Sequence, residues 1–371
     1  MTEMAKPLMI VGEAWGENEA RIKAGFCGAS GLELLRMLDE AGILSLTPTD
    51  REYISSFWNG GNPRMLDMVW RLHPEVARTN VLNLHPPGNN LEAICGGKKE
   101  GIVGFPAIVK AKYLPQTFIY ELERLGEEIV TVDPNLIVCL GNTPLWALCG
   151  STGVSKLRGT TRISTHTATG FKVLPTYHPA AVLRQWELRP TTVMDLAKAR
   201  REAEYPEIRR QRREIWIEPA IADIKRFIND HIIGCKILSV DIETAGNQIT
   251  CIGFSPTPTS AIVIPFYDER RKGRCYWESK GLELEAWALV KDVLVDPAIP
   301  KVFQNGLYDI AFLWRSVGIP VYGAAEDTML LHHALQPEAL KGLAYLGSVY
   351  ADEGAWKSDR SKGTDTIKRD A

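Results

Sequence analysis

The chain has 371 residues, of which 45% are hydrophobic and 24% are charged. This composition excludes a disordered or fibrous protein, and the length predicts two domains. The net charge of −2 argues against a protein that simply coats DNA, because such proteins are basic. It argues less against an enzyme that acts on DNA, because acidic metal ligands lower the net charge while local basic surface still binds phosphates.

The sequence shows no membrane or secretion signal. No apolar run approaches the ~20 residues needed to cross a bilayer, and Met1 to Ile10 lacks the pattern of a signal peptide. The seven cysteines contain no C-x-x-C pair, so we expect reduced thiols. We therefore expect a cytoplasmic protein with no membrane partner.

The first half is predicted to alternate strands and helices. An apolar run from Pro7 to Gly12 predicts a buried strand, and the apolar spacing from Gly31 to Ile43 predicts a helix. This alternation predicts an α/β fold with a mostly parallel sheet, whose ligands bind beyond the carboxyl ends of the strands. Further strands are expected at 78–84, Leu136–Gly141 and Lys172–Tyr177, and a helix at Tyr113–Leu125.

A charged stretch at 198–214 separates this half from a different pattern. We expect a domain at 1–205, a charged linker at 206–214 and a second domain at 215–371. For the arginines of the stretch, a solvated surface is favoured over a dedicated DNA contact.

The second domain is predicted to begin with a short strand at Ile215 and a helix through Asp230. A meander of three strands and then alternating helices and strands follow, which is the order of a ribonuclease-H-like α/β fold. The expected elements are strands Lys236–Glu243, Ile249–Phe254 and Ala261–Phe266, helix Leu282–Leu294, strand Val302–Gln304 and two more helical stretches.

Two carboxylates of this domain are predicted to share one face of a strand. Asp241 and Glu243 lie two residues apart in an apolar run, so their side chains point the same way. They repel each other unless a cation lies between them, and such hard oxygen ligands suit Mg²⁺ or Mn²⁺. An isolated pair would favour a plain exposed strand edge. Here Asn305 and Asp309 follow at the start of a predicted helix.

In this order, Asp241-Ile242-Glu243-Thr244 and Asn305-x-x-Tyr308-Asp309 resemble the DnaQ-like proofreading 3′–5′ exonuclease domain of family A DNA polymerases, especially those of phages. The resemblance covers about 215–371. It implies a two-metal site formed by Asp241, Glu243 and Asp309, which would activate water for attack on the terminal phosphodiester. Asn305 is implied to shape the turn or to contact substrate.

The end of the chain departs from this family. Asp370 is in the place of the fourth carboxylate, but Thr366 replaces the tyrosine that orients the water, and no polymerase domain follows. We expect impaired turnover or completion of the site by a partner. Asp327 is expected to be a structural residue at a helix N-terminus, and His332 and His333 to be packing or surface residues.

Four segments of the first half resemble the uracil-DNA glycosylase superfamily, closest to its family 4 and to phage relatives. The resemblance covers Pro7 to about Ala203 and includes an Arg158-Gly159 pair before the last motif. The segments are Gly12–Glu19 (G-E-A-x-G-E-x-E), Gly25–Gly31, Thr79-Asn80 with Pro86–Asn89, and His178–Arg184.

This resemblance assigns roles to individual residues. Glu13 is implied to position water or stabilise the cationic sugar, and Phe26 to stack on uracil. Asn80 is implied to pair with the base edge, with Asn83 as a competitor for this role. His178 is implied to stabilise the departing anion, and Arg184 to shape the substrate site. Singly, each has a structural alternative as a loop, core or turn residue.

Two features depart from family 4. Trp15 replaces the usual proline and places an indole beside the expected water site. Family 4 also carries a four-cysteine iron–sulfur cluster, but Leu84 stands where one cluster cysteine would be, and Cys95 alone cannot hold a cluster. We therefore expect no iron–sulfur cluster.

The sequence thus predicts a phage-encoded, bifunctional enzyme of the host cytoplasm that excises uracil from DNA and trims 3′ ends with a divalent metal. Its partners would be DNA and a separately encoded DNA polymerase. One alternative is a non-catalytic replication accessory that binds DNA or polymerase. Another is an exonuclease whose glycosylase fold only binds damage.

Overall fold

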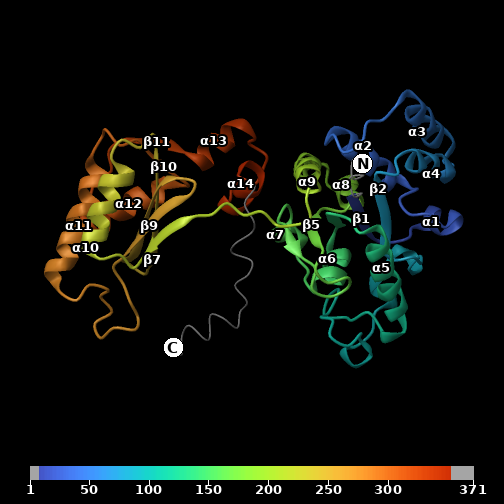
Figure 1. Cartoon of the computed structure of the whole chain (residues 1–371), viewed down its shortest axis with the longest axis horizontal. Helices are drawn as coiled ribbons and strands as arrows, with labels where there is room; N and C mark the ends of the chain where they lie inside the picture. Colours follow the sequence, from blue (N-terminus) through green and yellow to red (C-terminus); the bar gives the residue numbers. More distant parts are fainter. Residues whose placement is uncertain (1–7, 352–371) are drawn as a thin grey trace, which may run out of the picture. The chain divides into compact units, whose positions relative to one another are not determined.

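The structure is a computed structural model that describes residues 8–351 (Figure 1). Its contacts divide the described chain into two compact units. The first comprises residues 8–208 and 344–351, and the second comprises residues 209–343. The grouping by contacts therefore places the last described helix with the first unit, although it follows the second unit in the chain.

The first unit is built on a five-stranded sheet with the order β2-β1-β3-β5-β4. All neighbouring strands are parallel except the β4–β5 pair at one edge. The predicted mostly parallel α/β fold is confirmed. The strands are β1 (Leu8–Ala14), β2 (Val76–Leu82), β3 (Ile137–Leu140), β4 (Arg162–Ile163) and β5 (Lys172–Thr176).

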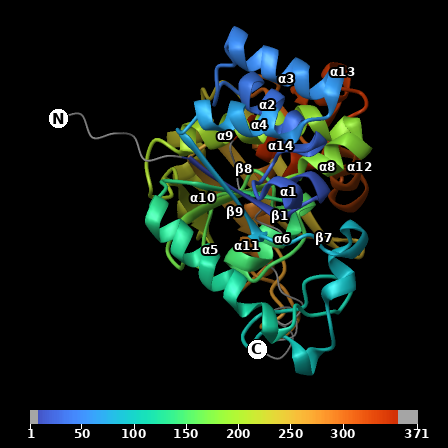
Figure 2. The ribbon, with the colours of Figure 1, turned by 90° about the vertical axis from the view of Figure 1, so that its right-hand side faces the viewer.

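Helices cover both faces of this sheet, as Figure 2 shows. Alternate strand residues point to opposite faces: Ile10 packs with α2, α8 and α9, whereas Val11 packs with α5 and α6. The unit is therefore a three-layer α/β/α sandwich. Its helices are α1 (Glu17–Ile22), α2 (Ala29–Glu40), α3 (Pro48–Gly60), α4 (Pro63–Leu72), α5 (Ile119–Val132), α6 (Asn142–Cys149), α7 (Val154–Leu157), α8 (Pro179–Arg184), α9 (Arg189–Glu202) and α14 (Leu343–Tyr350).

Helices α3 and α4 were not predicted, although both carry clear start signals. Thr47 and Asp50 form a reciprocal capping box at α3, and Pro48 occupies its first turn. Asn62 caps α4 before Pro63. These residues satisfy the free N–H groups of a first turn.

The expected helix at 113–125 begins later, at Ile119. Tyr113 instead pairs with Gly96 in an isolated bridge, so the backbone there is already bonded to another segment. The region between β2 and α5 consists of short turns without long elements. These are the 3₁₀ turns η1 (Pro87–Asn89), η2 (Leu91–Ile94), η3 (Lys98–Glu100) and η4 (Gln116–Phe118); η5 (Trp186–Leu188) lies between α8 and α9.

The second unit contains a six-stranded sheet with the order β11-β10-β7-β8-β9-β6. Strands β7, β8 and β9 form an antiparallel meander, and β10 and β11 continue the sheet in parallel beside β7. This is the ribonuclease-H-like arrangement that the sequence predicts. The strands are β6 (Glu214–Ile217), β7 (Leu238–Ala245), β8 (Gln248–Thr257), β9 (Ser260–Pro265), β10 (Lys301–Phe303) and β11 (Ala324–Asp327).

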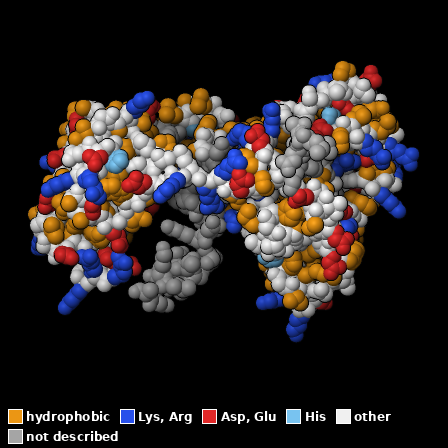
Figure 3. All heavy atoms as spheres, in the orientation of Figure 1, with side chains coloured by type: hydrophobic (Ala, Val, Ile, Leu, Met, Phe, Trp, Pro, Cys, Tyr) orange, Lys and Arg blue, Asp and Glu red, His pale blue; other side chains and the backbone are white. Residues whose placement is uncertain are grey.

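The core of the second unit lies between this sheet and helices α10, α11 and α12. Hydrophobic side chains gather on the surface near α13 (Figure 3), and Leu330 and Leu335 of that helix are exposed. Within residues 8–351, every helix is too short or too polar to span a bilayer. The helices are α10 (Ile221–Phe227), η6 (Ile228–Ile232), α11 (Lys280–Val295), α12 (Gly306–Val317) and α13 (Thr328–Leu335).

Candidate functional sites

The parallel strands β2, β1, β3 and β5 of the first unit all end at the same side of the sheet. Asn80, Glu13 and His178 lie in or directly after three of these strands, close to their carboxyl ends. Asn80 lies opposite Gly12 in the β2–β1 pair, and Glu13 follows Gly12. His178 comes two residues after β5, and Gly141 lies beside it after β3. The carboxyl ends of parallel strands are where ligands bind in such sheets.

Phe26 and Asn80 meet directly over Gly12. A Cβ atom at Gly12 would lie 2.3 Å from Asn80 Oδ1 and 2.7 Å from Phe26 Cζ. Only glycine leaves room for this approach, because real Cβ atoms do not come that close to other heavy atoms. Gly25 approaches the same amide, since its added Cβ would lie 3.0 Å from Asn80 Nδ2. The aromatic ring and the amide are thus held together over the end of β1.

The backbone of Phe26 is left-handed, with φ at 59°, a conformation that costs a non-glycine residue roughly 1–2 kcal/mol. Hydrogen bonds on both sides hold it. Trp70 Nε1 donates to the Phe26 carbonyl at 3.0 Å, and Glu19 Oε1 accepts from Cys27 N at 3.0 Å and Gly28 N at 2.9 Å. Arg78 Nε donates to the Gly25 carbonyl at 3.2 Å. Helix α1, helix α4 and strand β2 together position this one ring.

Glu13 is oriented by a residue that sequence reasoning missed. Thr143 Oγ1 donates to Glu13 Oε2 at 2.5 Å. Thr143 is buried in the first turn of α6. One carboxylate oxygen of Glu13 is therefore fixed by the protein.

His178 presents a defined hydrogen-bond donor. It caps α8, and its Nδ1 accepts from Ala180 N at 3.1 Å. The proton of the neutral ring is therefore on Nε2. Burial, with a smaller contribution from the positive charge of Arg184, lowers the pKa of His178 to about 4. At neutral pH the ring is uncharged and can donate one hydrogen bond from Nε2.

The other predicted residues of this unit lie at the margin of this cluster. Arg184 is exposed at the end of α8, and Asn83 is half-buried just after β2. The Asn83 backbone N–H donates to Glu121 Oε2 at 3.1 Å. Trp15 is half-buried, and its backbone N–H donates to the Leu84 carbonyl at 3.1 Å. Of the two asparagines, the one that contacts Gly12 is Asn80.

In the second unit, the strand geometry places Asp241 and Glu243 on one face. Along β7, Val240 and Ile242 are buried and the two acids are exposed. Asp309 lies in the first turn of α12 and is 5% exposed. Its Oδ1 accepts from the Ile242 backbone N–H at 3.1 Å. That bond brings the third carboxylate to the stretch between the first two.

The electrostatics of Asp309 reflect this crowding. Burial, together with the smaller effect of the nearby negative charge of Asp241, raises the pKa of Asp309 to about 6, against the opposing hydrogen bond from Ile242. A buried carboxylate beside another carboxylate is stabilised as an anion when a cation binds between them. The donor set of hard oxygen atoms fits Mg²⁺ or Mn²⁺. Within residues 8–351, however, no three acidic, histidine or cysteine side chains are already gathered closely enough to form a metal site.

Asp327 stabilises the turn at the start of α12, the helix that carries Asp309. Its carboxylate caps α13 by accepting from Met329 N at 2.8 Å, and it also accepts from Gly306 N at 2.7 Å and Asn305 N at 3.2 Å. Although burial acts to raise its pKa, these backbone donors hold the pKa below its usual value. Asp327 thus has the structural position that the sequence predicts.

Asn305 adopts a left-handed conformation, with φ at 61°, directly before α12. Its backbone thus lies at the turn that leads into α12. His332 is buried and His333 is exposed, as expected for a packing and a surface residue. Thr366 and Asp370 lie outside the described residues, so their predicted places in the site stay predictions.

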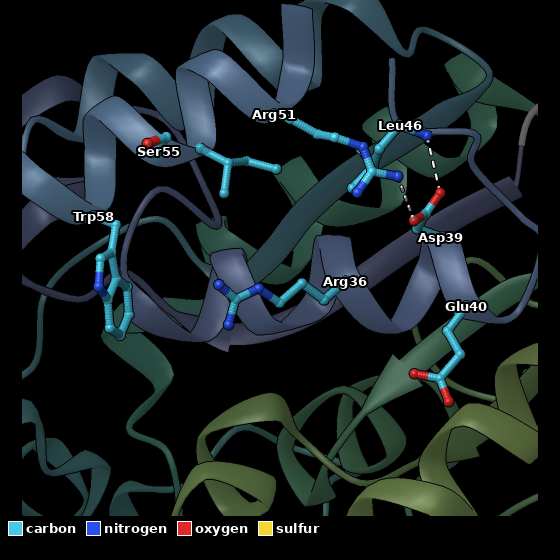
Figure 4. Close-up of a pocket in the computed structure, with 8 residues that line it drawn as sticks. Arg36, Asp39, Glu40, Leu46, Arg51, Ser55 and Trp58 are labelled. Atoms are coloured by element: carbon cyan, nitrogen blue, oxygen red, sulfur yellow. Dashed lines mark hydrogen bonds and ion pairs between the residues drawn. The ribbon is translucent and has the colours of Figure 1, made fainter. Parts of the chain in front are cut away.

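A separate hollow of about 510 Å³ lies between α2 and α3 (Figure 4). The Arg36 guanidinium is 5.8 Å from the centre of the Trp58 ring there, and Arg51 lies 3.8 Å from Asp39. Two arginines and two acids give the hollow a mixed charge. None of the predicted site residues lines it.

Sequence reasoning missed the residues that hold the site rather than form it. Glu19 belongs to a motif that was noticed, but its bonds to the Phe26 loop depend on tertiary contact. Trp70 and Thr143 lie in helices that carry no motif. Their hydrogen bonds span 44 and 130 residues, and a single sequence gives no signal at such separations.

In comparisons with known proteins, two different family models match the two halves of the chain. The family model of the Uracil DNA glycosylase superfamily matches residues 2–202, and that of a 3′–5′ exonuclease matches residues 222–365. A DNA polymerase of Bacillus phage SP01 is 24% identical over 62% of this chain. A type-4 uracil-DNA glycosylase of Sulfurisphaera tokodaii is 27% identical over 63% of this chain and 79% of its own length.

The chain spans about a quarter of that phage polymerase, 27% of its length. Among solved structures, the EXD2 exonuclease domain soaked in Mn and GMP is 15% identical at a TM-score of 0.26, covering 40% of this chain and 76% of its own. Brucella melitensis NrnC is 16% identical at a TM-score of 0.28, covering 39% and 63%. The chain belongs to the uracil DNA glycosylase superfamily and joins to that domain a 3′–5′ exonuclease domain, both from hydrolase families that process DNA.

Proposed function

We propose that the first unit excises uracil from DNA without a metal ion. The observation that carries this proposal is the meeting of Phe26 and Asn80 over Gly12, at the strand ends that also present Glu13 and His178. An aromatic face, an amide, a carboxylate and a neutral imidazole donor are the groups that base excision needs.

The geometry supports a division of roles after the nucleotide flips out of the duplex. Phe26 stacks on the base, and the Asn80 amide pairs with its edge. Nε2–H of His178 donates to the uracil oxygen on which negative charge develops, and such a donor is strongest in a dry site. Glu13, held through Thr143, stabilises the positive sugar and orients water toward it. Arg184 lies at the rim and is proposed to contact the DNA backbone.

This proposal is tested with duplexes that carry uracil or thymine at one position, incubated with excess protein in EDTA. Free uracil and an alkali-labile site should appear only in the uracil duplex. If alkali-labile sites never form at excess protein, the first unit is not a glycosylase under these conditions and binding of damage becomes the better proposal.

We propose that the second unit trims 3′ ends with Mg²⁺ or Mn²⁺. Asp241, Glu243 and Asp309 would hold the metal, with Asp370 as a further ligand. When bound, the metal would supply an activated water and stabilise the leaving oxygen. The chain's own contribution is placement: Ile242 N–H fixes Asp309, and Tyr308 is tied to β7 through Thr244 at 2.9 Å. Asn305 is proposed to shape this turn for substrate.

A 5′-labelled single strand tests the nuclease, because shortening from the 3′ end gives a ladder. Single strands should be preferred, since the last nucleotide must be unpaired to reach the carboxylates. Changing Asp370 to Asn should slow the ladder, and Thr366→Tyr should speed it. If Asp370→Asn leaves trimming unchanged while trimming still requires Asp241, then Asp370 is not a ligand.

We propose sequence boundaries at 1–205 and 215–371, with the charged linker 206–214 between them; α14 follows the second domain in the sequence but belongs by its contacts to the first unit. We also propose a role in phage DNA replication or repair in the host cytoplasm beside a separately encoded polymerase. Co-purification of a tagged chain with that polymerase from infected cells tests this role. A non-catalytic accessory is the alternative. The exposed leucines of α13, such as Leu335 at 72%, favour this accessory role because they offer an apolar surface to a protein partner. Binding of DNA or polymerase by a chain that has neither activity would support the accessory role.

We also propose that the glycosylase unit carries no iron–sulfur cluster. Leu84 and Cys95 both pack against the apolar cluster of β2 and α5, and burial raises the pKa of the Cys95 thiol, which disfavours the thiolate that iron needs. Stoichiometric iron and the absorption of a thiolate-bound cluster in the purified protein would overturn this proposal.

A further inference from the structure

Helix α14 follows the exonuclease sheet in the chain, yet from Ala344 onward it belongs to the first compact unit. One side of the helix is buried, with Leu346 at 5% exposure and Gly347 also buried. Its polar side chains meet residues that no family role above explains. Helix α14 therefore packs as an integral element of the glycosylase unit.

The main contact of α14 is the guanidinium of Arg158, which is 4% exposed. Two of its nitrogens, Nε and Nη2, donate to Asp195 at 2.8 and 2.5 Å. The third, Nη1, donates to Ser348 Oγ at 2.9 Å. Tyr345 lies against the same group, with its ring centre 5.6 Å away, and its hydroxyl is 3.0 Å from Thr191 Oγ1.

Asp195 connects Arg158 to the end of β5, the strand that His178 follows. Asp195 Oδ2 also accepts from Thr176 Oγ1 at 2.7 Å, and Thr176 is the last residue of β5, two positions before His178. Gly159 N–H donates to the Pro175 carbonyl at 2.9 Å. Gly159 and Asp195, the latter paired with Arg158, thus hold the end of β5 at two neighbouring residues.

We propose that Ser348 and Tyr345 are positioning residues of the glycosylase, acting through Arg158, Asp195 and Thr176 on the placement of His178. A buried guanidinium needs partners for its N–H groups, and an unmet donor is unfavourable. Without Ser348, Arg158 turns toward another acceptor and its paired geometry on Asp195 is disturbed. The uracil-excising unit therefore depends on a helix encoded after the exonuclease sheet. This inference rests on the proposed uracil excision.

The test uses the full chain with Ser348→Ala, Ser348→Thr and Tyr345→Phe, and Ser55→Ala as a matched exposed helix serine of the same unit. Uracil release is measured in EDTA across DNA concentrations, well below the melting temperature of each variant. Ser348→Ala should lower the maximal rate by about 3- to 10-fold with KM unchanged, because the residue does not touch DNA. Ser348→Thr should restore the rate. Tyr345→Phe keeps the ring on Arg158 and should lower the rate less than Ser348→Ala.

Trimming of a 5′-labelled single strand with Mg²⁺ should be equal in the wild-type chain and all variants. If Ser348→Ala lowers only the melting temperature, or changes KM and not the maximal rate, α14 is a structural cover and the proposal is overturned. If the wild-type chain releases no uracil at all, the proposed function itself fails. An active wild type with an equally active Ser348→Ala refutes the positioning role alone.

Discussion

The two candidate sites of this chain are built in opposite ways. In the glycosylase unit, three of the proposed residues have a hydrogen-bond partner that fixes them: Glu13 has Thr143, Phe26 has Trp70, and His178 has Ala180 N. In the exonuclease unit, Asp241 and Glu243 are exposed side by side on β7. The first site is organised by the protein alone, whereas the second is an assembly of like charges that a cation would complete.

Because the two sites are built differently, each activity should be sensitive to a different kind of change. A preorganised site loses function when a hydrogen bond or a close contact is removed, and it tolerates loss of metal. A carboxylate site loses function with its metal or with a single acid. The two activities on one chain should therefore be separable by single substitutions.

The largest effect is expected for Asp241→Ala, which removes the central carboxylate. Trimming of a 5′-labelled strand with Mg²⁺ should fall by roughly 1,000-fold or more, about 4 kcal/mol of transition-state stabilisation. Uracil release in EDTA should be unchanged. Asp292→Ala, an exposed acid of α11 in the same unit, is the control. Normal trimming by the Asp241 variant would remove β7 from the proposed site.

Next come His178→Ala and Glu13→Gln, each measured by single-turnover uracil release. Loss of one transition-state donor typically lowers the rate by about 100-fold or more, and the two variants should keep full trimming activity. His333→Ala changes an exposed histidine of the other unit and should have no effect on uracil release. Wild-type rates in both variants would contradict the proposed roles.

A smaller effect is expected for Trp70→Phe, which leaves the Phe26 carbonyl without its donor. An unmet buried acceptor costs about 1–3 kcal/mol of stability, so thermal unfolding should occur at a lower temperature. Uracil release should slow a few-fold because the Phe26 backbone loses the hydrogen bond from Trp70 that holds its ring in place. Trp58→Phe, at a tryptophan that is 70% exposed, is the matched control. Equal loss in both variants would show that the effect is not specific to this hydrogen bond.

The smallest effect is expected from pH. Because the pKa of His178 is lowered from 6.5 to about 4, the folded protein keeps the ring neutral where an unfolded chain takes up a proton. The stabilising contribution is thus complete above pH 6.5 and is lost as pH falls toward 4. Uracil release should show no step near pH 6.5 and should halve only near pH 4. A step in the rate of uracil release near pH 6.5 that is absent in His178→Ala would show that the pKa of His178 is not lowered in the folded protein.

Both folds were predictable from the sequence, because β1, β7 and their neighbours follow simple rules of burial and alternation. The candidate residues of each site were predicted from motif order, and the position of Asp327 at a helix N-terminus from its capping side chain. Helices α3 and α4 were not predicted, even though Thr47 and Asn62 mark their starts. The supporting contacts of Trp70 and Thr143, and the return of α14 to the first unit, arise only when distant segments pack together.

The central claim is that one chain holds a metal-free base-excising site and a separate metal-dependent nuclease site. It is tested most directly by the single-turnover rate of uracil release by the wild-type chain, measured on one duplex in EDTA and again with Mg²⁺. We expect equal rates of uracil release within about twofold, with 3′ trimming only in the Mg²⁺ reaction. Uracil release that needs Mg²⁺, or none in EDTA at excess protein, would contradict it.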